Sequence, residues 1–248
     1  MQLFAMVSFV TTLVVGLLVG GRLLLLARAT HRSPEFFLGA GIGLLSLAAI
    51  VEIAGLELAR AQHPWAYRTE VVALFAHSAS ASCMSFAVWR LFHPDRPWAL
   101  RLCLVETALL FTSWQAVILP SQHTWVTGFT FWFHLHVASR GAAFVWGAIA
   151  AGSHHQRLRR QLALGLADPF LCHRFLLWTV AMAASAGMLV TALLTNSLRG
   201  ELVFSYVPAL LSVSVLGLVG ASAMFLAFLP PVAYVQWIEQ RSAVLAAH

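Results

Sequence analysis

The stretch LVFSYVPALLSVSVLGLVGASAMFLAFL, residues 202–229, carries no charged side chain over 28 residues. About 20 predominantly apolar residues are enough for an α-helix to cross the roughly 30 Å hydrocarbon core of a bilayer. Proline, glycine and charged residues separate six further apolar stretches, which lie at about 3–27, 37–58, 70–92, 98–119, 125–152 and 173–195. The sequence therefore predicts an all-α fold, a polytopic membrane protein with seven transmembrane helices.

The composition of the whole chain supports the same class. Of 248 residues, 60% are hydrophobic and 10% are charged, whereas a soluble domain usually has about 25% charged residues. All 15 basic residues are Arg, so a retinal protein, which needs a Lys for its Schiff base, is excluded. The net charge of +6 does not indicate nucleic-acid binding, because the Arg residues lie at the ends of apolar stretches, where they set membrane orientation.

The Arg residues are distributed unevenly between the two sides of the predicted bundle. Eleven lie on the side of the first, third and fifth connections and of the tail: Arg22, Arg28, Arg32, Arg90, Arg96, Arg101, Arg157, Arg159, Arg160, Arg174 and Arg241. The other side has three: Arg60, Arg68 and Arg199. Because Arg is enriched in cytoplasmic loops, we expect the N-terminus outside and the C-terminus in the cytoplasm.

The chain divides into a bundle, residues 1–229, and a tail, residues 230–248. Apolar and aromatic side chains of the tail recur near one helical face: Tyr234, Trp237, Ile238 and Leu245. An amphipathic helix of this kind lies in the plane of the membrane interface. We therefore expect the tail to form a short interfacial helix on the cytoplasmic side.

Six ionisable residues lie inside the predicted membrane helices: Glu52, His77, Glu106, His134, His136 and Arg140. At about 1.5 Å of rise per residue, Glu106 and Arg140 lie within about 3 Å of the bilayer midplane on neighbouring helices. A lone Arg at this depth costs at least about 2.5–3.5 kcal/mol. We therefore expect an ion pair between Glu106 and Arg140, which either fixes helix packing or acts as a counter-ion or proton relay.

The two histidines of FHLHVASR point in different directions. His136 and Arg140 are four residues apart and share a helical face, whereas His134 lies about 200° away from His136. Because Arg140 should point inward, we expect His136 to share a pocket with Glu52 and His77 in the outer half, between the second, third and fifth helices. Glu52 would be held ionised there by a protonated His, or else would be neutral in so apolar a place. His134 is then expected to face a neighbouring helix or the outer interface.

Three kinds of chemistry fit these residues, and the sequence leaves them open. His77 and His136 could ligate a b-type haem, with Arg140 near a propionate. Two histidines and Glu52 could instead hold zinc or iron. In the third alternative, Glu52, His77, His134 and His136 form a hydrogen-bonded pocket that binds a ligand or cofactor or senses protons.

Two stretches, GGRLLLLARATHRSPEFFLG at 20–39 and FLPPVAYVQWIEQ at 228–240, resemble uncharacterised bacterial seven-helix integral membrane proteins. In those proteins the first cytoplasmic loop carries Arg, Thr and Pro-Glu, and the last helix ends in a Pro-Pro-x-x-Tyr-x-x-Trp tail. The resemblance implies a sensor-like or accessory protein of the bacterial inner membrane. It transfers no catalytic residue to this chain.

The favoured functional hypothesis is a non-enzymatic membrane protein, either a receptor or sensor for a ligand or cofactor, or a subunit of a membrane complex. Its partners would be the lipid bilayer and a protein in the membrane or cytoplasm. The first alternative is a haem- or metal-binding redox protein that uses His77 and His136. The second is a transporter, although no inverted repeat supports it.

Overall fold

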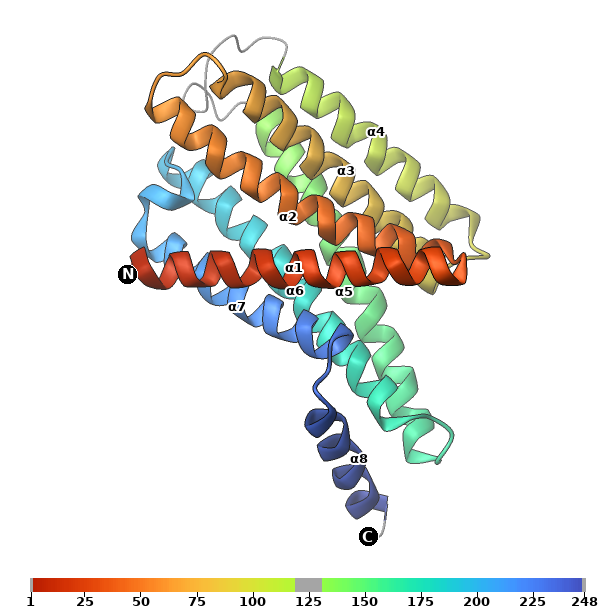
Figure 1. Cartoon of the computed structure of the whole chain (residues 1–248). Helices are drawn as coiled ribbons and strands as arrows, with labels where there is room; N and C mark the ends of the chain where they lie inside the picture. Colours follow the sequence, from red (N-terminus) through yellow and green to blue (C-terminus); the bar gives the residue numbers. More distant parts are fainter. Residues whose placement is uncertain (1, 119–130, 247–248) are drawn as a thin grey trace.

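The computed structural model describes residues 2–118 and 131–246. The described residues are entirely helical apart from short connections (Figure 1). The elements are α1 (Gln2–Thr30), α2 (Ser33–Arg60), α3 (Ala66–Phe92), α4 (Pro97–Ile118), α5 (Phe131–Ala163), α6 (Pro169–Arg199), the 3-10 helix η1 (Val203–Ser205), α7 (Val207–Phe228) and α8 (Val232–Ala246).

Six helices, α1 to α4, α6 and α7, are each long and apolar enough to cross a membrane. The chain is therefore a multi-pass helical membrane protein, as its sequence predicts. The described part of α5 is not among the six, because it carries polar side chains near both of its ends. The count of seven spans and their orientation stay predictions.

Helix α5 is longer than predicted, and residues 125–130, where the predicted helix begins, lie outside the described residues. Its end is at Ala163 rather than near residue 152. Residues 153–163 contain neither Pro nor Gly, so nothing in them breaks the helix. Gly165, with a φ of 70°, turns the chain out of the helical conformation just afterwards.

The termini of α6 show how local residues set a boundary. The Asp168 carboxylate accepts hydrogen bonds from the backbone N–H groups of Phe170, at 2.6 Å, and Leu171, at 3.2 Å. These are two of the donors that a helix start leaves without partners. Pro169 follows in the first turn, and Gly200 ends the helix with a φ of 64°.

The bundle is a closed ring of six helices with a seventh packed on its outside. Helix α1 packs against α2, α2 against α3, α3 against α5, α5 against α6, α6 against α7, and α7 against α1. Helix α4 covers the outer face of the α3–α5 pair. The tail helix α8 stands apart and, within the described residues, contacts α6 alone (Figure 1). Its interfacial position stays a prediction, and the side chain of Leu245 is outside the described part.

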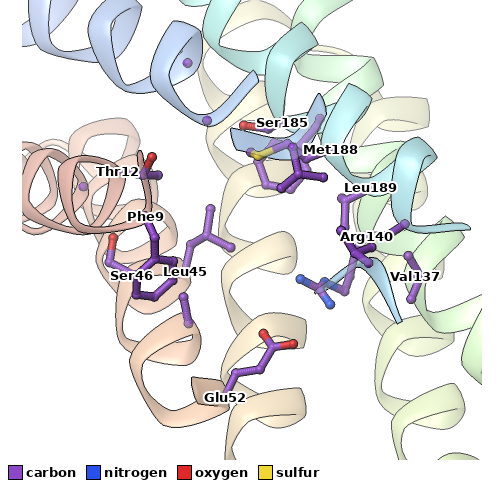
Figure 2. A pocket seen from close by; sticks show the side chains of 18 of the residues that line it. Phe9, Thr12, Leu45, Ser46, Glu52, Val137, Arg140, Ser185, Met188 and Leu189 are labelled. Atoms are coloured by element: carbon purple, nitrogen blue, oxygen red, sulfur yellow. The ribbon is translucent and has the colours of Figure 1, made fainter. Parts of the chain in front are cut away.

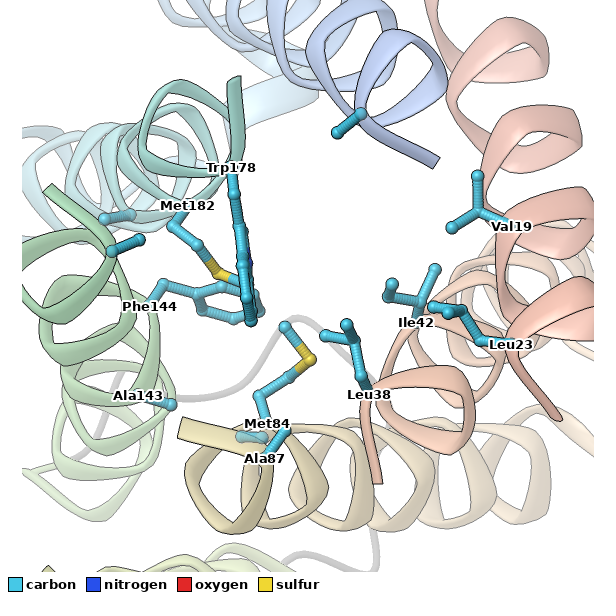
Figure 3. Close-up of a cluster of buried hydrophobic side chains, with 14 of the residues drawn as sticks. Val19, Leu23, Leu38, Ile42, Met84, Ala87, Ala143, Phe144, Trp178 and Met182 are labelled. Atoms are coloured by element: carbon cyan, nitrogen blue, oxygen red, sulfur yellow. The ribbon is translucent and has the colours of Figure 1, made fainter. Parts of the chain in front are cut away.

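Apolar packing fills one end of this ring. Leu23 and Leu38, from the α1–α2 end, approach Met84 of α3, while Phe144 and Trp178 approach from α5 and α6 (Figure 3). This end carries the C-terminus of α1 and the N-terminus of α2, which is the Arg-rich side. The opposite end, with the N-terminus of α1 and the C-terminus of α2, is packed less fully and contains the cavity described below.

Glycines allow α1 and α2 to touch through their backbones. A Cβ atom on Gly20 would lie 2.9 Å from the Gly43 nitrogen and 3.1 Å from the Gly39 oxygen. A Cβ on the neighbouring Gly21 would meet no atom within 4 Å. Small residues at such crossings let membrane helices gain van der Waals contact where no hydrophobic driving force operates between helices.

We predict that Gly20→Ala destabilises the bundle by about 1–3 kcal/mol, because the added methyl group pushes α2 away from α1. Gly21→Ala is the matched control and should be neutral or stabilising by up to about 1 kcal/mol, because Ala favours a helix over Gly. Unfolding of both variants in detergent, followed by circular dichroism, measures the difference. Equal stability of the two variants would show that the crossing does not require Gly20.

Candidate functional site

The half of the ring that carries the N-terminus of α1 encloses a cavity of about 780 Å³. Its wall is mostly apolar and includes Leu45, Phe144 and Met188. All seven helices of the bundle contribute to the wall, and Figure 2 shows side chains from α1, α2, α5 and α6 around the space. The predicted pocket was confined to the second, third and fifth helices, so the cavity is wider than the sequence indicated.

Two side chains of opposite charge enter this apolar wall. Glu52 of α2 and Arg140 of α5 both line the cavity and point into the same space (Figure 2). Behind them, the buried imidazole of His77 on α3 joins the two. Its Nε2 lies 2.8 Å from Glu52 Oε2, and its Nδ1 lies 2.8 Å from Arg140 Nη2. The side chain of Glu52 is 33% exposed and that of His77 is 6% exposed.

The hydrogen-bond donors fix the protonation of His77 in this arrangement. A guanidinium can only donate, so His77 Nδ1 accepts from Arg140 and carries no proton. The ring proton is then on Nε2 and is donated to the Glu52 carboxylate. The chain consists of an anion, a neutral ring and a cation. Glu52 is thus balanced by Arg140 through His77, and the expected protonated His is wrong for this geometry.

The predicted ion pair between Glu106 and Arg140 is wrong. Arg140 reaches across to α3 and α2, where His77 and Glu52 offer acceptors. Glu106, on α4, lies outside the ring and accepts a hydrogen bond of 2.5 Å from the Ser85 hydroxyl. The guanidinium lies beside His77, whereas the Glu106 carboxyl lies beside Ser85, eight residues farther along α3. This is about 12 Å at about 1.5 Å of rise per residue, so the two groups differ in depth.

The prediction for His136 and His134 holds in part. His136 is 1% exposed, so it lies inside the bundle, whereas His134 is half-buried near the start of α5. However, His136 Nδ1 is 3.2 Å from the hydroxyl of Ser113 on α4. The ring thus lies at the α4–α5 interface and is not among the residues that line the cavity. Of the four predicted binding residues, Glu52 and His77 are joined directly.

The donor atoms argue against the two cofactor alternatives. Both nitrogens of His77 are engaged, with Glu52 and Arg140, so neither presents a free lone pair to a haem iron. A metal site made of two histidines and Glu52 is not assembled either. Within residues 2–118 and 131–246, no three His, Cys, Asp or Glu side chains form a group that could hold a metal ion.

Several features of the site were missed by sequence reasoning. The hydroxyls of Ser85 and Ser113 are the partners of Glu106 and His136, yet in the sequence they read only as small packing residues. The contribution of α1, α6 and α7 to the cavity wall has no local signal, because it depends on closure of the ring. Met182 and Met188 line the wall, and flexible Met side chains of this kind adapt to ligands of different shape.

No family model, no curated protein and no solved structure matches the chain. The resemblance of residues 20–39 and 228–240 to bacterial seven-helix membrane proteins stays a prediction.

The carboxyl groups of Glu52 and Glu106 should respond differently to loss of charge. We predict that Glu52→Gln destabilises the protein by about 1.5–3 kcal/mol, because it removes the counter-charge of Arg140 and weakens a charge-assisted hydrogen bond. Glu106→Gln should change stability by less than about 1 kcal/mol, since the amide oxygen still accepts from Ser85. Denaturation in detergent compares the two variants.

A second measurement separates the charge from the general effect of substitution at residue 52. Glu52→Leu combined with Arg140→Leu should be more stable than Arg140→Leu alone, because the single change leaves a carboxylate without its cation. A double variant less stable than both single variants would contradict the charge chain.

Proposed function

We propose that this protein is a non-enzymatic receptor or sensor of the membrane that binds a small amphiphilic molecule inside the helical ring. The observation that carries the proposal is the 780 Å³ cavity, whose apolar wall contains Glu52 and Arg140. His77, behind the wall, joins these two groups. Ligand sites are typically apolar clefts of about 300–1,000 Å³ with a few polar groups that fix orientation. The cavity matches both features.

The polar groups indicate what kind of ligand head the cavity would take. One carboxylate oxygen of Glu52 and one nitrogen of Arg140 are occupied by His77. The remaining parts of both groups line the cavity, so they can offer an acceptor and several donors to a ligand. The apolar wall suits a hydrocarbon body. An amphiphile with a hydrogen-bonding or charged head would therefore satisfy both parts.

Binding at this place would alter contacts between three helices. The chain connects α2, α3 and α5, so a ligand head that competes for Glu52 or Arg140 changes how these helices are held together. A ligand shifts a conformational equilibrium only by its difference in affinity for the two states. The charge chain supplies such a difference, because it is intact in one state and exchanged for ligand contacts in the other. A partner protein in the membrane or cytoplasm would receive the change.

We also propose that α5 is the seventh span, that the N-terminus is outside and that the membrane is a bacterial inner membrane. Support for the span comes from the place of α5 in the ring, between α3 and α6. Support for the orientation comes from the split of Arg residues, eleven against three. The cavity would then open on the outer half of the membrane.

Ligand binding is tested with two amphiphiles of opposite charge, laurate and dodecylamine, by native mass spectrometry of the detergent-solubilised protein. We expect the unmodified protein to retain at least one of them. Ala49→Trp should abolish retention, because Ala49 lines the cavity and the indole fills it. Ala54→Trp on the same helix is the control, since Ala54 is exposed on the outside. The absence of retention by the unmodified protein, or equal retention by both variants, would contradict the proposal.

Orientation is tested with single cysteines introduced at the two ends of the bundle. Leu166→Cys lies in the exposed α5–α6 turn and His63→Cys in the exposed α2–α3 turn. In intact cells, a membrane-impermeant maleimide should label residue 63 at once and residue 166 only after permeabilisation. Labelling in the reverse order would overturn the proposed topology. The native Cys83, Cys103 and Cys172 are buried or half-buried, and the unmodified protein gives their background.

A further inference from the structure

A second hollow, separate from the central cavity, lies where α1 turns into α2. It has a volume of about 420 Å³ and is lined by basic, apolar and aromatic side chains. Arg28, His31 and Arg32 form its basic part, and Leu24 and Phe36 form its apolar part. We call this hollow the α1–α2 groove.

The two arginines of the groove are exposed. Within residues 2–118 and 131–246, neither Arg28 nor Arg32 makes an ion pair or a side-chain hydrogen bond. Two other arginines on this side of the bundle are engaged by the protein. Arg22 donates to the Phe228 carbonyl at 2.7 Å, and Arg90 lies 4.3 Å from the centre of the Trp89 ring. The groove is therefore lined by two exposed guanidinium groups that are available to a ligand.

The turn that holds these side chains is strained and leaves backbone donors free. His31 has a φ of 55°, a left-handed conformation that a non-glycine residue rarely adopts. Helix α2 begins directly afterwards, and its N-cap, Arg32, makes no side-chain capping bond. The first N–H groups of a helix have no acceptor within the helix. The helix start thus adds partial positive charge to the two arginines, which the acidic Glu35 in the first turn of α2 offsets in part.

The position of the groove relative to the bilayer limits what can occupy it. Helices α1 and α2 are both candidate membrane spans, so the turn between them lies at a membrane surface, at the depth of lipid headgroups. Leu24 is 37% exposed and Phe36 is 51% exposed, and both are directed outward from the bundle. On α1, Leu17 lies seven residues before Leu24 on the same face and is 41% exposed. The apolar surface continues from the groove toward the bilayer centre.

We propose that the α1–α2 groove binds one anionic phospholipid, such as a phosphatidylglycerol. Its phosphate would accept hydrogen bonds from Arg28 and Arg32, since guanidinium groups recognise phosphate through paired N–H donors. One acyl chain would lie along Leu24 and Phe36. This proposal does not depend on the ligand of the central cavity, because the two sites share no lining residue.

The test measures lipid binding to the full chain in detergent by native mass spectrometry, with dioleoylphosphatidylglycerol and dioleoylphosphatidylcholine as probes. We expect phosphatidylglycerol to bind at least about tenfold more tightly, because only this headgroup has a net negative charge. Arg28→Gln combined with Arg32→Gln should remove the preference. Arg159→Gln combined with Arg160→Gln removes the same charge from another exposed segment of this side and should leave the preference unchanged.

Two results would overturn the proposal. Equal loss of preference in both double variants would show that general charge, and not the groove, selects the lipid. Full competition by inorganic phosphate or glycerol 3-phosphate would show that the groove binds a free anion without need of acyl chains. Unfolding of the variants without added lipid, followed by circular dichroism, verifies that the exposed substitutions leave the bundle folded.

Discussion

The structure depends on the burial of one positive charge. Arg140 lies inside the ring, where an uncompensated guanidinium would cost several kcal/mol. Glu52 compensates it, but the two groups are joined through His77, 2.8 Å from each. This intermediate ring matters for packing. It lets α2, α3 and α5 meet at one point while the carboxylate and the guanidinium still border the cavity. A direct Glu52–Arg140 pair would instead turn the two groups toward each other.

The difference in packing between the two ends of the ring follows from this buried charge and from the glycine crossing of α1 and α2. At the Arg-rich end, Gly20 and Gly39 bring α1 and α2 into backbone contact, so large side chains such as Trp178 fill the remaining space. At the other end, polar groups occupy part of the cavity wall. Apolar side chains that pack directly against a polar group deprive it of hydrogen bonds. The cavity therefore lies beside the charge chain.

The sequence predicted the class and the candidate residues but not the pairing. Hydropathy identifies α1 to α4, α6 and α7 because a membrane leaves few alternatives for long apolar stretches. It also singled out Glu52, His77 and Arg140 as costly groups that need partners. Their pairing depends on which side of α5 faces the ring and on the position of α4 outside it. Neither is encoded locally, and the depth of Arg140 was estimated from a helix whose end was misplaced by about three turns of about 3.6 residues each. The estimate of depth alone thus led to Glu106 as the predicted partner of Arg140.

The neutral state of His77 has a consequence for how the bundle can change shape. A proton on Nδ1 would place two donors face to face, since Arg140 can only donate, so protonation and the Arg140 contact exclude each other. Movement of α5 away from α3 breaks the same contact and frees Nδ1. Protonation of His77 and separation of α5 from α3 are therefore linked events, and each favours the other. A ligand head that draws Arg140 into the cavity would act in the same direction, because it removes the donor from Nδ1. Under the proposed function, the charge chain would thus join the occupancy of the cavity to the packing of α5 on its neighbours.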